Sequence, residues 1–136
     1  MNTFLIDADT FSYVLSKDQK VTHKLQDVLK KNAEILICPV VLYEVKRGLY
    51  KKGMTRELRF FNKLISFHSW HEFSIETWNK GAELWAECRK RGQPTGEGLD
   101  GDALIAAQAY EHNATVVTHN QKHFDFLGVP WEDWLV

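Results

Sequence analysis

The feature that most constrains the fold is an alternation of short apolar runs with longer segments of helical periodicity. Largely apolar runs at residues 4–6, 34–38 and 114–118 are typical of strands buried on both faces. Between them, apolar residues recur at spacings of three and four, which predicts helices over residues 20–31, 39–52, 55–67 and 75–91. This alternation predicts a parallel sheet with helices on both faces.

Weaker patterns complete the expected sheet. Residues 68–73 predict a further strand, and residues 129–131 predict an edge strand, where Pro130 is tolerable. Three more helical patterns are present: one begins at residue 11, one spans residues 103–112, and one forms a single turn at 121–126. Residues 92–98 have the composition of a loop. We therefore expect an α/β fold with three layers, α/β/α, around a mainly parallel sheet of four to five strands.

Length and composition indicate one ordinary globular domain. The 136 residues suffice for a single domain spanning 1–136, and the net charge of -1 gives no overall attraction to nucleic acid. The N-terminus does not resemble a signal peptide, and no apolar segment reaches the length of a membrane span. Cys38 and Cys88 lack a CxxC spacing and are interpreted as reduced core residues. A cytoplasmic protein with no membrane partner is expected.

Acidic residues gather where the predicted strands end. Some directly follow a strand, and others lie at the start of a helix beside a strand end. Because ligands of such sheets bind at the carboxyl ends of the strands, this is the expected place for chemistry. Five carboxylates and one amide are predicted to meet there: Asp7, Asp9, Glu44, Asp100, Asp102 and Asn120.

Helix capping is the alternative explanation for several of these acids. Asp9, Asp100 and Asp102 stand beside predicted helix starts, where aspartate is a favoured cap. Asp7 is less suited to capping because it closes an apolar strand, and its burial would require a cation or several hydrogen-bond donors. Glu44 interrupts an otherwise apolar helical segment, although a solvated helix face would also accommodate it.

Clustered carboxylates repel one another unless a cation lies between them. Hard divalent ions with oxygen ligands remove this conflict, and Mg²⁺ or Mn²⁺ suits such a site. No Cys/His set has zinc spacing, and His119 and His123, which flank the acids, are expected at the surface. The sequence contains no P-loop and no G-x-S-x-G motif. The acidic set therefore best supports attack of metal-activated water on a phosphodiester.

Four short segments occur in order along the chain, followed by a recognisable tail. They are residues 5–9 (LIDAD), 43–49 (YEVKRGL), 102–107 (DALIAA) and 117–120 (VTHN), and the tail is 128–134 (GVPWEDW). Together they resemble PIN domains, and more narrowly the VapC toxins of prokaryotic toxin–antitoxin modules. The resemblance implies a PIN-like fold whose metal-binding acids fall on Asp7, Glu44 and Asp102. Its fourth position falls on Asn120, and Asp100 is an additional metal-ligand candidate.

The resemblance also implies an activity and partners. It implies a Mg²⁺- or Mn²⁺-dependent endoribonuclease that cuts structured RNA, such as tRNA or rRNA loops, leaving 5′-phosphate and 3′-hydroxyl ends. A homodimer is implied too, with a VapB-like antitoxin whose tail blocks the acidic site. Lys46, Arg47 and Thr118 are the expected substrate-binding residues; the first two belong to a basic cluster that suits RNA phosphates or a solvated face equally well. Trp78 and Trp85 share a predicted apolar stripe and are expected in core or dimer contacts.

Other classes remain open at this point. Residues 7–10 also resemble the nucleophile motif of haloacid-dehalogenase phosphatases, with Asp7 as phosphoryl acceptor and Thr118 and Lys122 as later parts of that signature. The order argues against it, because the acidic pair at 100 and 102 precedes these two residues instead of following them. A receiver-like signalling domain also uses a strand-end aspartate. A degenerate PIN domain that binds RNA or a partner without cleavage is the remaining alternative.

Overall fold

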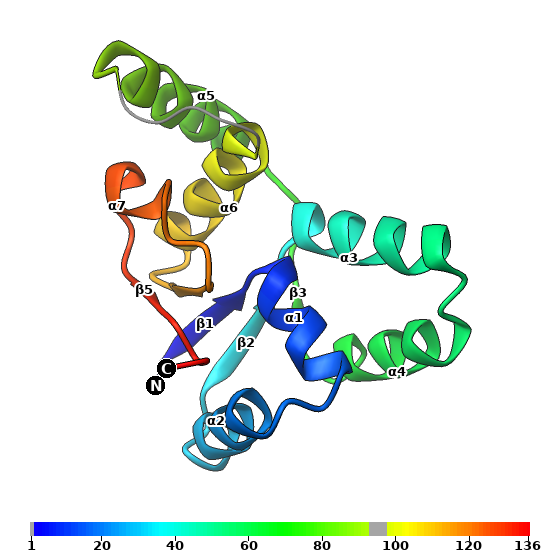
Figure 1. Ribbon diagram of the computed structural model, residues 1–136. Coiled ribbons are helices and arrows are strands. Elements are labelled where there is room, and N and C mark those ends of the chain that lie inside the picture. The colour runs from blue at the N-terminus through cyan, green and yellow to red at the C-terminus, as the bar shows by residue number, and fades with distance from the viewer. Residues whose placement is uncertain (1, 93–97) are drawn as a thin grey trace.

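The computed structural model describes residues 2–92 and 98–136, which form strands alternating with helices (Figure 1). The strands are β1 (Thr3–Ile6), β2 (Glu34–Ile37), β3 (Ser69–Trp70), β4 (Thr115–Val117) and β5 (Trp131–Glu132). The helices are α1 (Ala8–Leu15), α2 (Gln19–Lys30), α3 (Pro39–Lys52), α4 (Thr55–Ile65), α5 (Ile75–Lys90), α6 (Leu99–Glu111) and α7 (Phe124–Leu127). The expected α/β class is confirmed.

The sheet has the strand order β3-β2-β1-β4-β5, and every strand pair in the described residues is parallel. The chain first winds from β1 through β2 to β3, and then returns across the sheet to β4 and β5. Because such crossovers are right-handed, the first set of connections places α1 to α4 on one face and the second places α5 to α7 on the other. Figure 1 shows these two groups of helices on either side of β1 and β2. The direction of winding reverses between β1 and β4, so the carboxyl ends of these neighbours form the switch point where ligands bind in such sheets.

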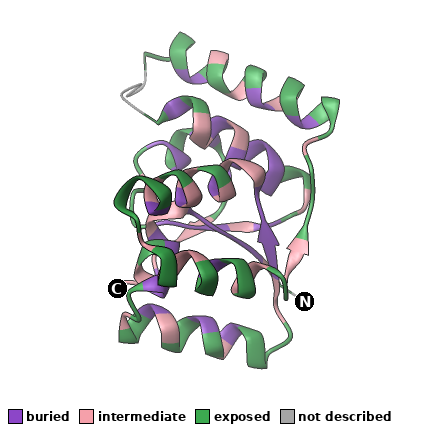
Figure 2. Cartoon of the chain, turned by 90° about the vertical axis from the view of Figure 1, so that its right-hand side faces the viewer, coloured by how far each residue is buried: buried purple, intermediate pink, exposed green. Residues whose placement is uncertain are grey.

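The central strands are the core, and local sequence signals explain the helix ends. Leu5, Leu36 and Val116 are fully buried on three adjacent strands, and Figure 2 shows mostly buried strands in the middle of the molecule. In α3, proline occupies the first turn, where its missing N–H costs nothing, and Gly53 ends the helix in the left-handed region at φ 64°. Cys38 and Cys88 are buried free thiols, as expected. None of the described helices is both long and apolar enough to cross a bilayer.

Several predicted boundaries differ from the structure. The two edge strands are only two residues long, and β5 begins at Trp131 instead of 129. The first helix begins at Ala8 instead of residue 11, because Asp7 caps it, and α6 begins at Leu99, ahead of both acids expected at its start. Most of the predicted loop at 92–98 lies outside the described residues.

The apolar stripe predicted on α5 has the wrong phase. Gly81 and Cys88 are buried, whereas Trp78 and Trp85 are exposed by 52% and 37%. A Cβ at Gly81 would stand 2.8 Å from Leu104 Cδ2 of α6, so the two helices make their close approach at the glycine. Packing between small and branched residues therefore turns the tryptophans toward solvent, and neither is a core residue.

Candidate functional site

Asp7 stands at the carboxyl end of β1 and caps α1. Its Oδ1 accepts a 2.6 Å hydrogen bond from the Ala8 N–H, and its Oδ2 accepts a 2.9 Å bond from the Thr118 hydroxyl beyond β4. The side chain is buried at 8% exposure. The expectation that Asp7 is less suited to capping is therefore wrong. Asp9, for which capping was the alternative, lies in the first turn of α1 instead.

Burial and neighbouring charges strongly raise the pKa of Asp7. Burial is the largest cause that raises the pKa of this carboxyl, followed by repulsion from Asp9 and Asp102, and the pKa reaches about 7. The hydrogen bonds from Ala8 and Thr118 lower it and offset only part of the rise. Desolvation and like charges both disfavour the ionised form, so a cation beside Asp7 would stabilise its carboxylate.

Glu44, one turn into α3, approaches α6. Its Oε2 would lie 3.4 Å from a Cβ built on Gly101, and Gly101 is the residue that precedes Asp102. Burial is the first cause that raises the pKa of Glu44 and repulsion from Asp102 is the second; Arg47 lowers it and Asp9 raises it. Glu44 is therefore within electrostatic reach of Asp102 from α6 and Asp9 from α1, two segments far from it in sequence.

Asp102 forms a hydrogen bond with a buried histidine. Its Oδ2 lies 2.7 Å from Nδ1 of His123, whose side chain is only 2% exposed. Burial raises the pKa of Asp102, and the hydrogen bond and charge of His123 lower it. The prediction of a surface position is wrong for His123 and right for His119, which is 53% exposed and pairs with Asp133 at 2.9 Å. The sequence feature that could have placed His123 in the site is its position shortly after the end of β4.

The remaining predicted site residues lie around these three acids. Asp9 is half-buried and repels all three of them, whereas Asp100 is exposed in the first turn of α6 and is not among the charges that shift their pKa values. Neither Asp100 nor Asp102 caps α6, because Gly98 holds that position. Asn120 is exposed, and its backbone N–H donates to the hydroxyl of Thr118; its C=O, 3.2 Å from the same hydroxyl, is the alternative acceptor to Asp7 for the single hydroxyl hydrogen.

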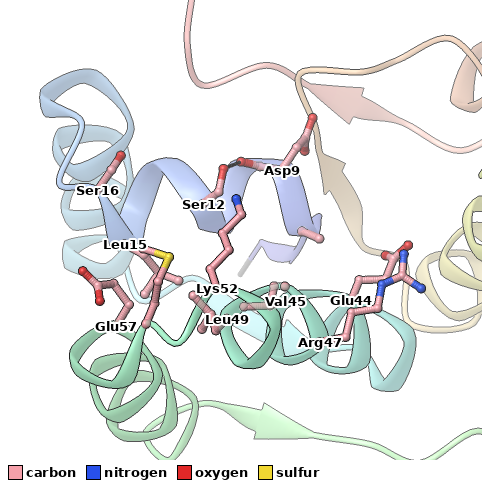
Figure 3. A pocket seen from close by; sticks show the side chains of 13 residues that line it. Asp9, Ser12, Leu15, Ser16, Glu44, Val45, Arg47, Leu49, Lys52 and Glu57 are labelled. Atoms are coloured by element: carbon pink, nitrogen blue, oxygen red, sulfur yellow. Dashed lines mark hydrogen bonds between the residues drawn. The ribbon is translucent and has the colours of Figure 1, made fainter.

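The predicted substrate-binding residues fall into two different settings. Thr118 is fully buried and bonds to Asp7, so it supports an acid and does not face solvent. Arg47 is exposed and lines a groove of about 460 Å³, whereas Lys46 is half-buried and does not line it. Figure 3 shows this groove between α1 and α3, with Asp9 and Glu44 at one end and the Lys52 amine pointing across it toward α1.

The donor chemistry of the acids fits a hard divalent cation. Within residues 2–92 and 98–136, no three His, Cys, Asp or Glu side chains are already arranged to hold a metal ion. Asp7 and Asp102 each direct oxygens to hydrogen-bond donors, so a shared ion requires some adjustment of the side chains. The oxygen-only donors and the raised pKa values of the three acids are nevertheless what a divalent cation with oxygen ligands would satisfy.

Comparison with known proteins identifies the family. The family model described as PIN domain matches residues 4–128. The chain is 31% identical over 124 residues to ribonuclease VapC2 of Rickettsia felis, a match that covers 89% of each protein. This match over nearly the whole chain displaces the phosphatase and receiver interpretations. In the phosphatase interpretation Glu44 would also have no role.

Solved structures agree with this match. VapBC2 from Rickettsia felis, bound to a DNA fragment from its promoter, contains a chain with a TM-score of 0.82 and 27% identity, covering 97% of this chain and 98% of that one. DNA-bound VapBC from Salmonella typhimurium has the same fold, with a TM-score of 0.82, 24% identity and coverage of 98% and 99%. The acidic strand ends, the family match and the fold agree: the chain belongs to the PIN-domain family and is a VapC homologue.

Proposed function

We propose that this PIN domain is a Mg²⁺- or Mn²⁺-dependent endoribonuclease, in which Asp7, Glu44 and Asp102 hold the metal. The observation that carries the proposal is that Asp102 repels both Asp7 and Glu44 and that Asp9 repels all three, so that burial and neighbouring acids raise the pKa of each. Acids that serve only a structural role have no reason to lie where they repel one another, whereas acids that share a cation do. The 31% identity to a ribonuclease supports the activity.

The protein's own residues have separate tasks in this proposal. A bound divalent cation supplies Lewis-acid activation of water and of the phosphodiester. Thr118 holds the Asp7 carboxylate through its 2.9 Å hydrogen bond, and its own oxygen accepts a hydrogen bond from the Asn120 N–H. Asn120 and the exposed Asp100 are the proposed additional polar groups for water or a second ion.

RNA binding is proposed along the groove beside the acids. The net charge of -1 requires local basic groups, and Arg47 and Lys52 both line the groove that ends at Glu44. Lys46 lies next to Arg47 in α3 and would contact phosphates outside the groove. Arg47 lies 5.2 Å from the ring centroid of exposed Tyr43, the residue that precedes Glu44 in α3. Loops of structured RNA, such as those of tRNA or rRNA, would bring single-stranded phosphates to this groove.

A VapB-like antitoxin and a second copy of the chain are the proposed protein partners, met in the cytoplasm. The antitoxin is supported by the similar structures, which are VapBC complexes. A homodimer is supported by exposed apolar side chains on α5, where Ile75 is 68% and Trp78 is 52% exposed. Antitoxin bound along the groove would cover Asp9 and Glu44 and so inhibit the enzyme.

The proposal is tested by incubating purified protein with total RNA in Mg²⁺, in Mn²⁺ and in EDTA. We expect cuts in the presence of either metal, and no cuts in EDTA or with Asp102→Asn. RNA binding without cleavage in any metal would instead identify a degenerate PIN domain.

A further inference from the structure

The segment after β4 contacts both Asp7 and Asp102, the second of which raises the pKa of the first. Thr118, which is fully buried, donates to Asp7 Oδ2, and His123, which is 2% exposed, bonds to Asp102 Oδ2 at 2.7 Å. The six residues from 118 to 123 thus carry a hydrogen-bond partner for each acid. His119, in the same segment, pairs instead with Asp133 and is exposed.

We infer that His123 is a positioning residue that holds Asp102 through Oδ2 and leaves Oδ1 as the atom for a divalent cation. The inference rests on the proposed metal-dependent function and adds a residue outside the acidic set. Hydrogen bonds from neighbouring groups orient the carboxylates that bind metals, and loss of such a partner typically lowers metal affinity about 10-fold to 100-fold.

The geometry defines which ring nitrogen carries the hydrogen. An ionised Asp102 can only accept, so Nδ1 of His123 donates to it. Nε2 is buried and has no hydrogen-bond partner among the described residues. In the opposite tautomer, two lone pairs would face each other at 2.7 Å and an N–H would be buried without an acceptor, so the Nδ1–H form is favoured.

The packing around His123 restricts the orientation of the ring that bonds to Asp102. His123 immediately precedes α7, and the next residue, Phe124, is fully buried. A ring this enclosed loses little further freedom when it bonds to Asp102, because packing already restricts its orientation. The bond joins positions 21 residues apart, so it also ties the start of α6 to the segment after β4.

The test measures Mn²⁺ affinity of the purified full chain by calorimetry, without RNA, for the wild type, for Asp102→Asn and for four histidine variants. In His123→Asn, the amide nitrogen can take the place of Nδ1, whereas in His123→Gln it reaches the place of Nε2. His123→Leu removes the donor. His119→Leu is the matched control, because it breaks the His119–Asp133 pair in the same segment.

We expect Mn²⁺ affinity to fall about 10-fold to 100-fold in the Leu and Gln variants of His123. The Asn variant should bind within about threefold of wild type, and His119→Leu should be unchanged. Circular dichroism in EDTA identifies any unfolded variant. If His123→Leu does not fold, the comparison of Asn with Gln decides, since both are amides and only the position of the donor differs.

Equal Mn²⁺ affinity in the Asn and Gln variants, or an unchanged affinity in a folded Leu variant, would overturn the positioning role while leaving the metal site intact. Failure of the wild type to bind Mn²⁺, or binding that is insensitive to Asp102→Asn, would overturn the proposed function itself. The two failures are therefore distinguishable in one set of titrations.

Discussion

The ends of β1 and β2 are built alike and behave differently. The two strands are parallel neighbours, with Leu5 opposite Leu36, and each is followed by a buried residue that caps the next helix. That residue is Asp7 after β1, at 8% exposure, and Cys38 after β2, at 1%. Asp7 accepts hydrogen bonds from two donors, whereas the Cys38 side chain makes no capping bond.

The same burial gives these two ends opposite chemistry. Burial raises the pKa of Cys38 to about 12, helped by repulsion from Asp7 and Glu44, so this thiol stays neutral and unreactive. Burial raises the pKa of Asp7 only to about 7, so its charge responds to its surroundings near neutral pH. Only the β1 end lies at the switch point beside β4, and there a cation can change the state of the acid.

The largest expected effect comes from Asp7→Asn. RNA cleavage should fall on the order of a thousandfold or more, because the metal loses a charged ligand and because removing one member of a group of residues that act together in catalysis typically removes most of the activity. Cleavage rates in Mn²⁺, with melting temperature in EDTA as a folding check, measure this. Asp18→Asn is the matched control, because Asp18 also caps a helix, α2, with its side chain accepting from Val21 N–H. A similar loss in both variants would show that capping, and not metal binding, explains Asp7.

The second effect is on stability against pH in EDTA. Asp7 binds its proton more tightly in the folded state, so the free energy of unfolding should fall as pH rises from about 4 to about 7. From the ordinary pKa of 3.8 to about 7, this one group accounts for up to about 4 kcal/mol. Urea unfolding at several pH values measures it. Saturating Mn²⁺ or Asp7→Asn should flatten the dependence, whereas stability that rises over this range would contradict a raised pKa.

Thr118→Val should have an intermediate effect. It keeps the shape of a buried side chain but removes the donor to Asp7 Oδ2, so cleavage should fall about 10-fold to 100-fold. Because that bond lowers the pKa of Asp7, its loss should also move the pH transition in EDTA upward. Single-turnover cleavage and the same urea series test both expectations. Cleavage equal to wild type would show that Thr118 serves only packing.

Cys38→Ala should have the smallest effect. Loss of a buried sulfur leaves a small cavity and lowers the free energy of unfolding by about 1 kcal/mol. Cleavage and Mn²⁺ affinity should stay within about twofold of wild type, because the neutral thiol takes no part in the chemistry. Calorimetry and cleavage assays check this. A large loss of Mn²⁺ affinity would mean that the β2 end belongs to the site and that the contrast with β1 is false.

Sequence patterns predicted the central part of the molecule better than its edges. The runs that became β1, β2 and β4 are apolar because both of their faces are covered, and this is visible in composition alone. The edge strands β3 and β5 are two residues long and carry no comparable signal. The stripe on α5 was misplaced because a close approach at Gly81, which is set by Leu104 of α6, outweighs the burial of two tryptophans.

The sequence by itself determined the order of the strands and helices and the placement of Asp7 and Glu44 beside strand ends, because periodicity and apolar runs are properties of neighbouring residues. The partner of each acid was decided only by the tertiary structure. Thr118 reaches Asp7 across 111 positions and His123 reaches Asp102 across 21, so these bonds exist only once the sheet and helices have packed. The raised pKa values have the same origin, since burial and repulsion arise when distant segments of the chain come together.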